Sequence, residues 1–178
     1  MEIMRLVVTG PVGAGKSTFI RAVSEIDVVD TDRQATDETG LLKEKTTVGF
    51  DFGRLQFEPE MALHLYGTPG QPRFDFMWEY LINHAHAYIL LVPAHRPADF
   101  RKAQLIHEFM AERATLPMIV GVTHADCEDA WSLDSVAIAT GFTDSAQRPP
   151  FIPINATEPV SVTNALMMLI NQYVQLAV

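Results

Sequence analysis

The stretch Gly10-Pro11-Val12-Gly13-Ala14-Gly15-Lys16-Ser17 decides the fold of this 178-residue chain. It fits the pattern G-x-x-x-x-G-K-[ST] at every required position. The apolar run Ile3–Thr9 before it predicts a buried strand, and Lys16–Ser24 predicts a helix that begins at the loop. A glycine-rich loop between a strand and a helix turns backbone N–H groups and the positive end of the helix dipole toward an anion. We therefore expect a phosphate-binding loop.

Two side chains of this loop have distinct expected roles. Lys16 is expected to reach the β- and γ-phosphates of a nucleotide, which makes it both a binding and a catalytic residue. The Ser17 hydroxyl is expected to ligate Mg²⁺. A glycine-rich turn with a chance Lys-Ser pair would not account for the flanking strand and helix. The expected binding residues of the loop are Gly10, Gly13, Ala14, Gly15, Lys16, Ser17 and Thr18.

The rest of the chain alternates strand-like runs with helical patterns. Strands are expected at residues 48–57, 61–66, 87–92, 118–122 and 151–154, and helices near 72–84, 97–114, 132–140 and 159–177. The short connector 58–60 makes the first two of these strands a hairpin. We predict one α/β domain spanning residues 1–178, a three-layer P-loop NTPase fold of the small G-domain type. Its sheet should be mostly parallel, with one antiparallel strand pair.

Composition limits the classes of partner. The formal net charge of −9 disfavours nucleic acid and anionic membranes. The single cysteine, Cys127, excludes an internal disulfide and fits a reducing compartment. No apolar run is long enough to span a bilayer, and neither end carries a lipidation motif. We expect a cytoplasmic protein without a membrane anchor and without a nucleic-acid partner.

Four later segments resemble the motifs of Ras- and Rab-like small GTPases and occur in the same order. Residues 46–52 resemble switch I and the strand after it, and Gly67-Thr68-Pro69-Gly70-Gln71 resembles the switch II motif D-x-x-G-Q. Thr123-His124-Ala125-Asp126 is similar to the guanine motif [NT]-K-x-D, and Asn155-Ala156-Thr157 to the S-A-K loop. The resemblance covers almost the whole chain and extends to bacterial small GTPases of the conservon and MglA-like group.

This resemblance implies a GTP- and GDP-binding switch with Mg²⁺ and slow, partner-stimulated hydrolysis. Asp126 would accept hydrogen bonds from N1–H and the amine of guanine, a donor pair that adenine lacks. Thr47, with Thr46 as the alternative, would contact Mg²⁺ and the γ-phosphate. The Gly70 N–H would hold the same phosphate, and Gln71 would orient the attacking water as a catalytic residue. The implied contacts to the base come from Thr123, His124, Asp126, Asn155, Ala156 and Thr157.

Three residues depart from the small-GTPase pattern. Gly67 stands where most GTPases keep an aspartate that holds Mg²⁺ through a water. His124 replaces a lysine that packs over the base, and an imidazole brings little charge at neutral pH. Val12 replaces a glycine and is expected to crowd the space that Gln71 and an arginine share beside the γ-phosphate. We interpret the nearby cations as solvated surface charge: Lys43, Lys45 and Arg54.

Other interpretations stay open at this point. Gly67 and Val12 favour a nucleotide-binding interaction module with little or no hydrolysis. A P-loop ATPase or nucleotide kinase is disfavoured, because no arginine-rich lid segment is present. Asp126 alone would also fit a helix N-cap. Residues 74–80 hold more bulky apolar side chains than one helix face can bury, so an exposed part would suit an effector, a roadblock-type regulator or a second copy of the chain.

Overall fold

The structure, a computed structural model, describes residues 2–28, 50–70 and 75–177. Its strands form one six-stranded sheet in the order β2-β3-β1-β4-β5-β6. β2 is antiparallel to β3, and the other neighbouring strands are parallel. This arrangement confirms the mostly parallel sheet with one antiparallel pair. The strands are β1 (Glu2–Thr9), β2 (Asp51–Glu58), β3 (Met61–Gly67), β4 (Ala87–Pro93), β5 (Met118–Thr123) and β6 (Phe151–Pro153).

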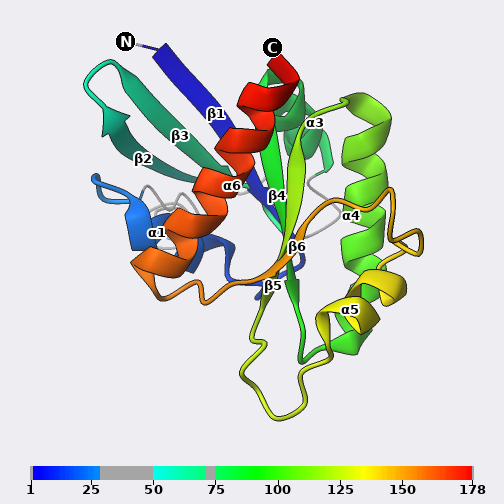
Figure 1. The fold of residues 1–178 in the computed structure, drawn as a ribbon. Helices are drawn as coiled ribbons and strands as arrows, with labels where there is room; N and C mark the ends of the chain where they lie inside the picture. The colour runs from blue at the N-terminus through cyan, green and yellow to red at the C-terminus, as the bar shows by residue number, and fades with distance from the viewer. Residues whose placement is uncertain (1, 29–49, 71–74, 178) are drawn as a thin grey trace, which may run out of the picture.

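Helices cover both faces of the sheet. α1 and α6 lie on one face, and α3, α4 and α5 on the other (Figure 1). The helix expected at residues 97–114 begins instead with a separate 3₁₀ turn, and its α-helical part starts at Phe100. The helices are α1 (Lys16–Val23), α3 (Asp75–His84), the 3₁₀ helix η2 (Pro97–Asp99), α4 (Phe100–Arg113), α5 (Leu133–Ala139) and α6 (Pro159–Ala177).

The core follows from the alternation of side chains along each strand. On β1, Leu6 and Val8 pack with α1 and α6, whereas Val7 between them packs with α3 and α4. β4, at the centre, is buried along its whole length, as its continuous apolar run predicts. Truncating a core side chain such as Leu6 to alanine is expected to lower the free energy of unfolding by about 2–5 kcal/mol.

The topology brings five loops to one edge of the sheet. β1, β3, β4, β5 and β6 are parallel, so their carboxyl ends all point to this edge. β1 lies between β3 and β4, so the strands that follow β1 in the chain lie on both sides of it in the sheet. Ligands of open α/β sheets bind at such a point, outside the carboxyl ends of the strands. The residues after these strands are therefore the candidates for a ligand-binding site.

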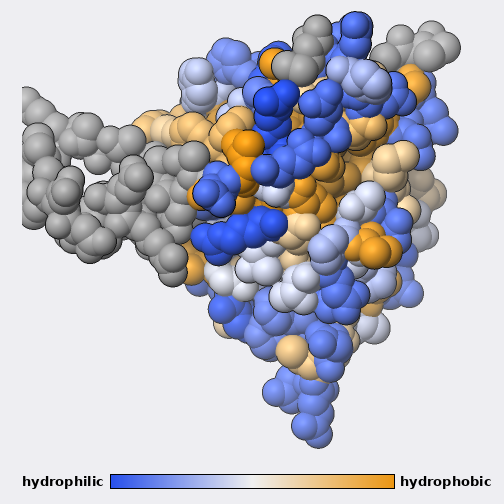
Figure 2. Space-filling view, turned by 90° about the vertical axis from the view of Figure 1, so that its left-hand side faces the viewer, coloured by the Kyte–Doolittle hydropathy of each residue, from blue (hydrophilic) through white to orange (hydrophobic). Residues whose placement is uncertain are grey.

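The surface gives less information about function than this edge does. Figure 2 shows the side of the molecule on the left of Figure 1, where hydrophilic residues surround a band of apolar ones. Within the described part of the chain, none of the helices has the length and hydropathy that crossing a membrane demands.

Candidate functional site

The loop Gly10–Ser17 connects β1 to α1 and lies against the end of β4. Gly15 is the N-cap of α1 and has a φ of 102°, in the left-handed region that favours glycine. Gly10 approaches the backbone so closely that a Cβ would lie 2.3 Å from the carbonyl oxygen of Leu91. The sequence needs glycine at both positions to fold the chain tightly around the start of a helix.

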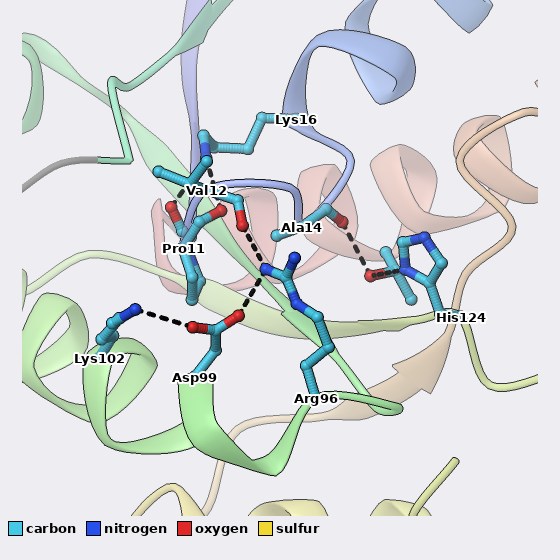
Figure 3. Close-up of polar contacts among 10 residues, drawn as sticks. Pro11, Val12, Ala14, Lys16, Arg96, Asp99, Lys102 and His124 are labelled. Atoms are coloured by element: carbon cyan, nitrogen blue, oxygen red, sulfur yellow. Dashed lines mark hydrogen bonds and ion pairs between the residues drawn. The ribbon is translucent and has the colours of Figure 1, made fainter. Parts of the chain in front are cut away.

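Lys16 is buried at the centre of this loop. Its ammonium group donates hydrogen bonds to the carbonyl oxygens of Gly10 and Pro11, each at 2.8 Å (Figure 3). Burial lowers the pKa of Lys16 to about 8; the Asp51 carboxylate opposes this shift, and the Arg96 guanidinium adds to it. An ammonium group has three donors, so the geometry leaves Lys16 able to bind an anion inside the loop.

Ser17 follows at the first turn of α1. Its hydroxyl donates a hydrogen bond to the carboxylate of Asp51, the first residue of β2. Hydroxyl and carboxylate oxygens are hard ligands of the kind that Mg²⁺ prefers, so this pair fits the ion that the loop motif implies. Thr18, the next residue of the helix, is half-buried.

Two side chains from neighbouring loops hold the phosphate loop from outside. The Thr123 hydroxyl, at the end of β5, donates to the carbonyl oxygen of Ala14 at 2.8 Å. The Arg96 guanidinium, in the loop after β4, donates to the carbonyl oxygen of Val12 and pairs with the Asp99 carboxylate (Figure 3). Because both contacts engage carbonyl groups, neither occupies a backbone N–H group of the loop.

Sequence reasoning missed Arg96. Its guanidinium is packed so closely on the phosphate loop that a Cβ on Gly13 would lie 2.9 Å from Nη1. Asp99, which pairs with Arg96, also accepts a hydrogen bond from Lys102 at 3.0 Å. The position of Arg96 just beyond β4 could have indicated its place at the site, since every loop at the carboxyl edge can reach the site. Arg54, one of the three cations interpreted from the sequence as surface charge, lies on β2 opposite His64 of β3.

The residue after Thr123 has an unusual backbone. His124 has a φ of 56°, and its Nδ1 lies 3.2 Å from the Thr123 hydroxyl oxygen. Its ring packs against that of His95, with 4.4 Å between the centroids. Burial, then His95 and Arg96, lower the pKa of His124, and Asp126 opposes the shift. The lowered pKa favours the neutral imidazole, in line with the expectation that His124 brings little charge.

Asp126 lies in the exposed turn after β5. The interpretation of Asp126 as a helix N-cap is wrong, because α5 begins at Leu133 and its N-cap is Ser132, which accepts a hydrogen bond from the Ser135 N–H. Among the described residues, no hydrogen bond or ion pair involves the Asp126 carboxylate. The side chain is thus available to a ligand from solvent.

The loop after β6 lies beside the phosphate loop. Asn155 accepts hydrogen bonds through Oδ1 from the backbone N–H and the hydroxyl of Thr157, at 3.1 and 2.7 Å. A Cβ on Gly15 would lie 3.4 Å from the Cβ of Ala156 and 3.9 Å from Cγ2 of Thr123. Three separate segments of the chain therefore meet at Gly15.

The segment after β3 is tied to the end of β1. Thr68 donates from its backbone N–H to the Val8 carbonyl oxygen at 2.9 Å and from its hydroxyl to that of Thr9 at 2.8 Å. Gly70 then approaches Val12 so closely that a Cβ would lie 2.6 Å from the Val12 nitrogen. Several predicted residues lie outside the described part of the chain: Thr46, Thr47 and Gln71, with the cations Lys43 and Lys45.

Comparison with known proteins gives two findings. A sequence family described as "Conserved hypothetical ATP binding protein" matches residues 26–175, most of the chain beyond the phosphate loop. No protein with a curated description matches. Among solved structures, the Arl6 (BBS3) small GTPase of Trypanosoma brucei, with the bound nucleotide analogue GppNp, is similar with a TM-score of 0.69. The two are 17% identical, and the alignment covers 98% of this chain and 99% of that chain, so the likeness concerns the fold.

Proposed function

We propose that this chain, which belongs to the family described as conserved hypothetical ATP binding proteins, binds GTP and GDP with Mg²⁺ and acts as a molecular switch with slow GTP hydrolysis. One observation carries the proposal. The phosphate loop, Thr123 at the end of β5 and the loop that contains Ala156 meet around Gly15. A nucleotide needs its phosphates and its base held by adjacent segments, and this convergence supports such a site.

The phosphate end is the better supported half. Lys16 supplies a buried positive charge. Residues 13–18 lead into the N-terminus of α1, whose backbone N–H groups and dipole attract anions. The Ser17 hydroxyl is the expected metal ligand. A bound Mg²⁺ would neutralise part of the phosphate charge. Thr47, with Thr46 as the alternative, is proposed as the second protein ligand of the ion.

The base end supports guanine. An exposed carboxylate accepts hydrogen bonds and donates none, so Asp126 fits the N1–H and amine donors of guanine and not the edge of adenine. The Ala156 N–H is proposed to donate to guanine O6, with Asn155 and Thr157 shaping that loop. Thr123 and His124 are proposed to complete the base site. The family description names ATP, so the choice between guanine and adenine distinguishes this proposal from an ATP-binding protein.

The segment that contains Gly70 supports a switch. Thr68 fixes the start of this segment to β1, and Gly70 lies against Val12 of the phosphate loop. The Gly70 N–H is proposed to hold the γ-phosphate. Gln71 follows directly and is proposed to orient the attacking water. Losing the γ-phosphate would remove this contact together with that of Thr47, which is how small GTPases signal.

A second candidate is a nucleotide-binding module that hardly hydrolyses its ligand. The packing of Gly70 against Val12 favours it, because the valine side chain is 56% exposed beside the residue that precedes Gln71 and is expected to crowd the γ-phosphate. In either case an effector or a roadblock-type regulator is the proposed partner. Phe76 and Tyr80 on α3 are exposed at 56% and 60%, whereas Trp78 between them is buried, so part of this aromatic segment is free for contact. A homo-oligomer through the same face stays open.

The experiment is to identify the nucleotide that the purified chain carries. Denaturing the protein and separating the released nucleotides by ion exchange is expected to give GDP or GTP. A matched Lys16→Ala preparation is expected to carry none. Adenine nucleotides in the wild-type extract would contradict the proposal and favour an ATP-binding protein.

A further inference from the structure

The carboxylate expected at the Mg²⁺ site is missing from its usual place in the sequence. Gly67, at the end of β3, has no side chain where most small GTPases keep an aspartate. β2 runs antiparallel to β3, and its register pairs Asp51 directly with Gly67. Directly paired residues of an antiparallel sheet have neighbouring side-chain positions. The partner strand therefore delivers a carboxylate to the position where β3 lacks one.

Contacts at this pair place the carboxylate beside the metal-binding hydroxyl. A Cβ on Gly67 would lie 3.1 Å from the Cβ of Asp51 and 3.3 Å from its Oδ2. The same Oδ2 accepts the hydrogen bond from the Ser17 hydroxyl. An aspartate at position 67 would crowd and repel Asp51, so the site has room for one of the two carboxylates.

The charge of Asp51 is close to the phosphate-binding lysine. Its carboxylate accepts the hydrogen bond from Ser17, the residue directly after Lys16. Its negative charge thus lies at the phosphate end of the site. A carboxylate next to nucleotide phosphates is unfavourable unless a cation lies between them. Asp51 would weaken nucleotide binding unless a metal ion came with the nucleotide.

We propose that Asp51 supplies the carboxylate of the Mg²⁺ site, either as a direct ligand or through a bound water, in place of an aspartate at Gly67. The inference rests on the proposed nucleotide-binding function and names the residue that makes its metal dependence possible. Ser17 and Asp51 would then form the protein side of the site on α1 and β2, and the hydrogen bond between them holds the two side chains next to each other.

The test measures how Mg²⁺ changes the release of a fluorescent GDP derivative. Asp51→Asn keeps the shape and the ability to contact Ser17 but removes the charge, and Asp51→Ala is the second variant. Each is measured in excess EDTA and across a series of free Mg²⁺ concentrations. Glu58→Gln, the same kind of change at the exposed far end of β2, is the matched control.

The expected result is a split between the two conditions. Both Asp51 variants should need about tenfold or more Mg²⁺ to reach half of the metal effect, as loss of a metal-site carboxylate typically gives. Their release rates in EDTA should equal or fall below that of the wild type, because a charge that repels phosphate is gone. Glu58→Gln should match the wild type in both conditions.

The opposite results are equally clear. If either folded Asp51 variant keeps the wild-type Mg²⁺ dependence, the inference is overturned. An equal acceleration of release in EDTA and in Mg²⁺ also overturns it, since Asp51 would then only brace Ser17. Failure of the proposed function looks different, because wild-type protein would then bind no fluorescent GDP at all.

Discussion

The Arg96 guanidinium donates a hydrogen bond to the carbonyl oxygen of Val12 and so connects the loop after β4 to the phosphate loop (Figure 3). Asp99, whose carboxylate is largely buried, holds the same guanidinium from the other side. The pKa of Asp99 is lowered despite its burial, because Lys102 and Arg96 both stabilise its charged form. Arg96 is therefore fixed between an anion and the backbone of the loop, and it adds positive charge where phosphates are proposed to bind.

Replacing Arg96 should weaken nucleotide binding without unfolding the chain. Arg96→Ala is expected to lower the affinity for GDP-Mg²⁺ about tenfold, since a hydrogen bond to a charged group contributes on the order of 1.5–3 kcal/mol. Arg96→Lys should recover part of the loss, because it keeps the charge but not the two-pronged geometry. Fluorescent GDP titration is the measurement, with Arg101→Ala on the exposed face of α4 as the matched control. Equal affinities for Arg96→Ala and Arg101→Ala would show that the contact with Val12 has no part in binding.

Lys16→Ala should abolish nucleotide binding. Lys16 is the buried positive charge of the loop, and its ammonium group is the donor that β- and γ-phosphates need. The variant is expected to remain folded, because it also removes a charge whose burial opposes ionisation. Titration with GTP-Mg²⁺ and a thermal unfolding curve test the two statements together. Lys102→Ala, an exposed lysine near the same loop, should keep most of the affinity. Undiminished binding by Lys16→Ala would remove the loop from the account.

Asp126→Asn should move the preference from guanine toward xanthine. An amide can donate to the 2-oxo group that xanthine has in place of the guanine amine, whereas a carboxylate cannot. Competition of GTP and XTP against a fluorescent nucleotide measures the change. The neighbouring exposed carboxylate in Asp129→Asn serves as the control. If Asp126→Asn and Asp129→Asn leave the ratio of the two affinities at the wild-type value, Asp126 does not contact the base.

Val12→Gly should raise the rate of GTP hydrolysis about tenfold, which corresponds to about 1.4 kcal/mol of barrier. The valine lies against Gly70, the residue before Gln71, so removing its side chain opens the approach to the γ-phosphate. Gln71→Leu should lower whatever rate the wild type has, because it removes the side chain proposed to orient water. Single-turnover hydrolysis of both variants is the measurement. A Gln71→Leu rate equal to wild type, with no gain in Val12→Gly, would favour the binding module over the switch.

The fold could be predicted almost completely from the sequence. The apolar run at residues 87–92 indicated a strand buried on both faces, and β4 is fully buried. The connector 58–60 predicted the hairpin that makes β2 antiparallel to β3. The turn at Pro97–Asp99 was the main difference, since a proline-initiated pattern does not distinguish a 3₁₀ turn from the first turn of an α-helix. Local periodicity was sufficient because each element packs on one continuous sheet.

The site could be predicted only where it follows a motif. Lys16, Ser17 and Thr123 were predicted from short patterns, and the structure brings them together at the carboxyl edge of the sheet. Arg96 lies outside the motifs, and Asp51 has no assigned role within residues 46–52, because their proposed roles depend on which strands are neighbours and in which register. The sequence identified the missing carboxylate at Gly67 but not the residue paired with it. The narrower likeness to the bacterial conservon and MglA-like group stays a prediction.

The most direct test of the central proposal is calorimetric titration of the nucleotide-free chain with GTP-Mg²⁺ and, in parallel, ATP-Mg²⁺. The account predicts that GTP binds at least about a hundredfold more tightly, since each hydrogen bond to the Asp126 carboxylate contributes on the order of 1.5–3 kcal/mol and adenine offers neither. Equal affinities, or tighter binding of ATP, would contradict a guanine-nucleotide switch and leave the chain an ATP-binding protein.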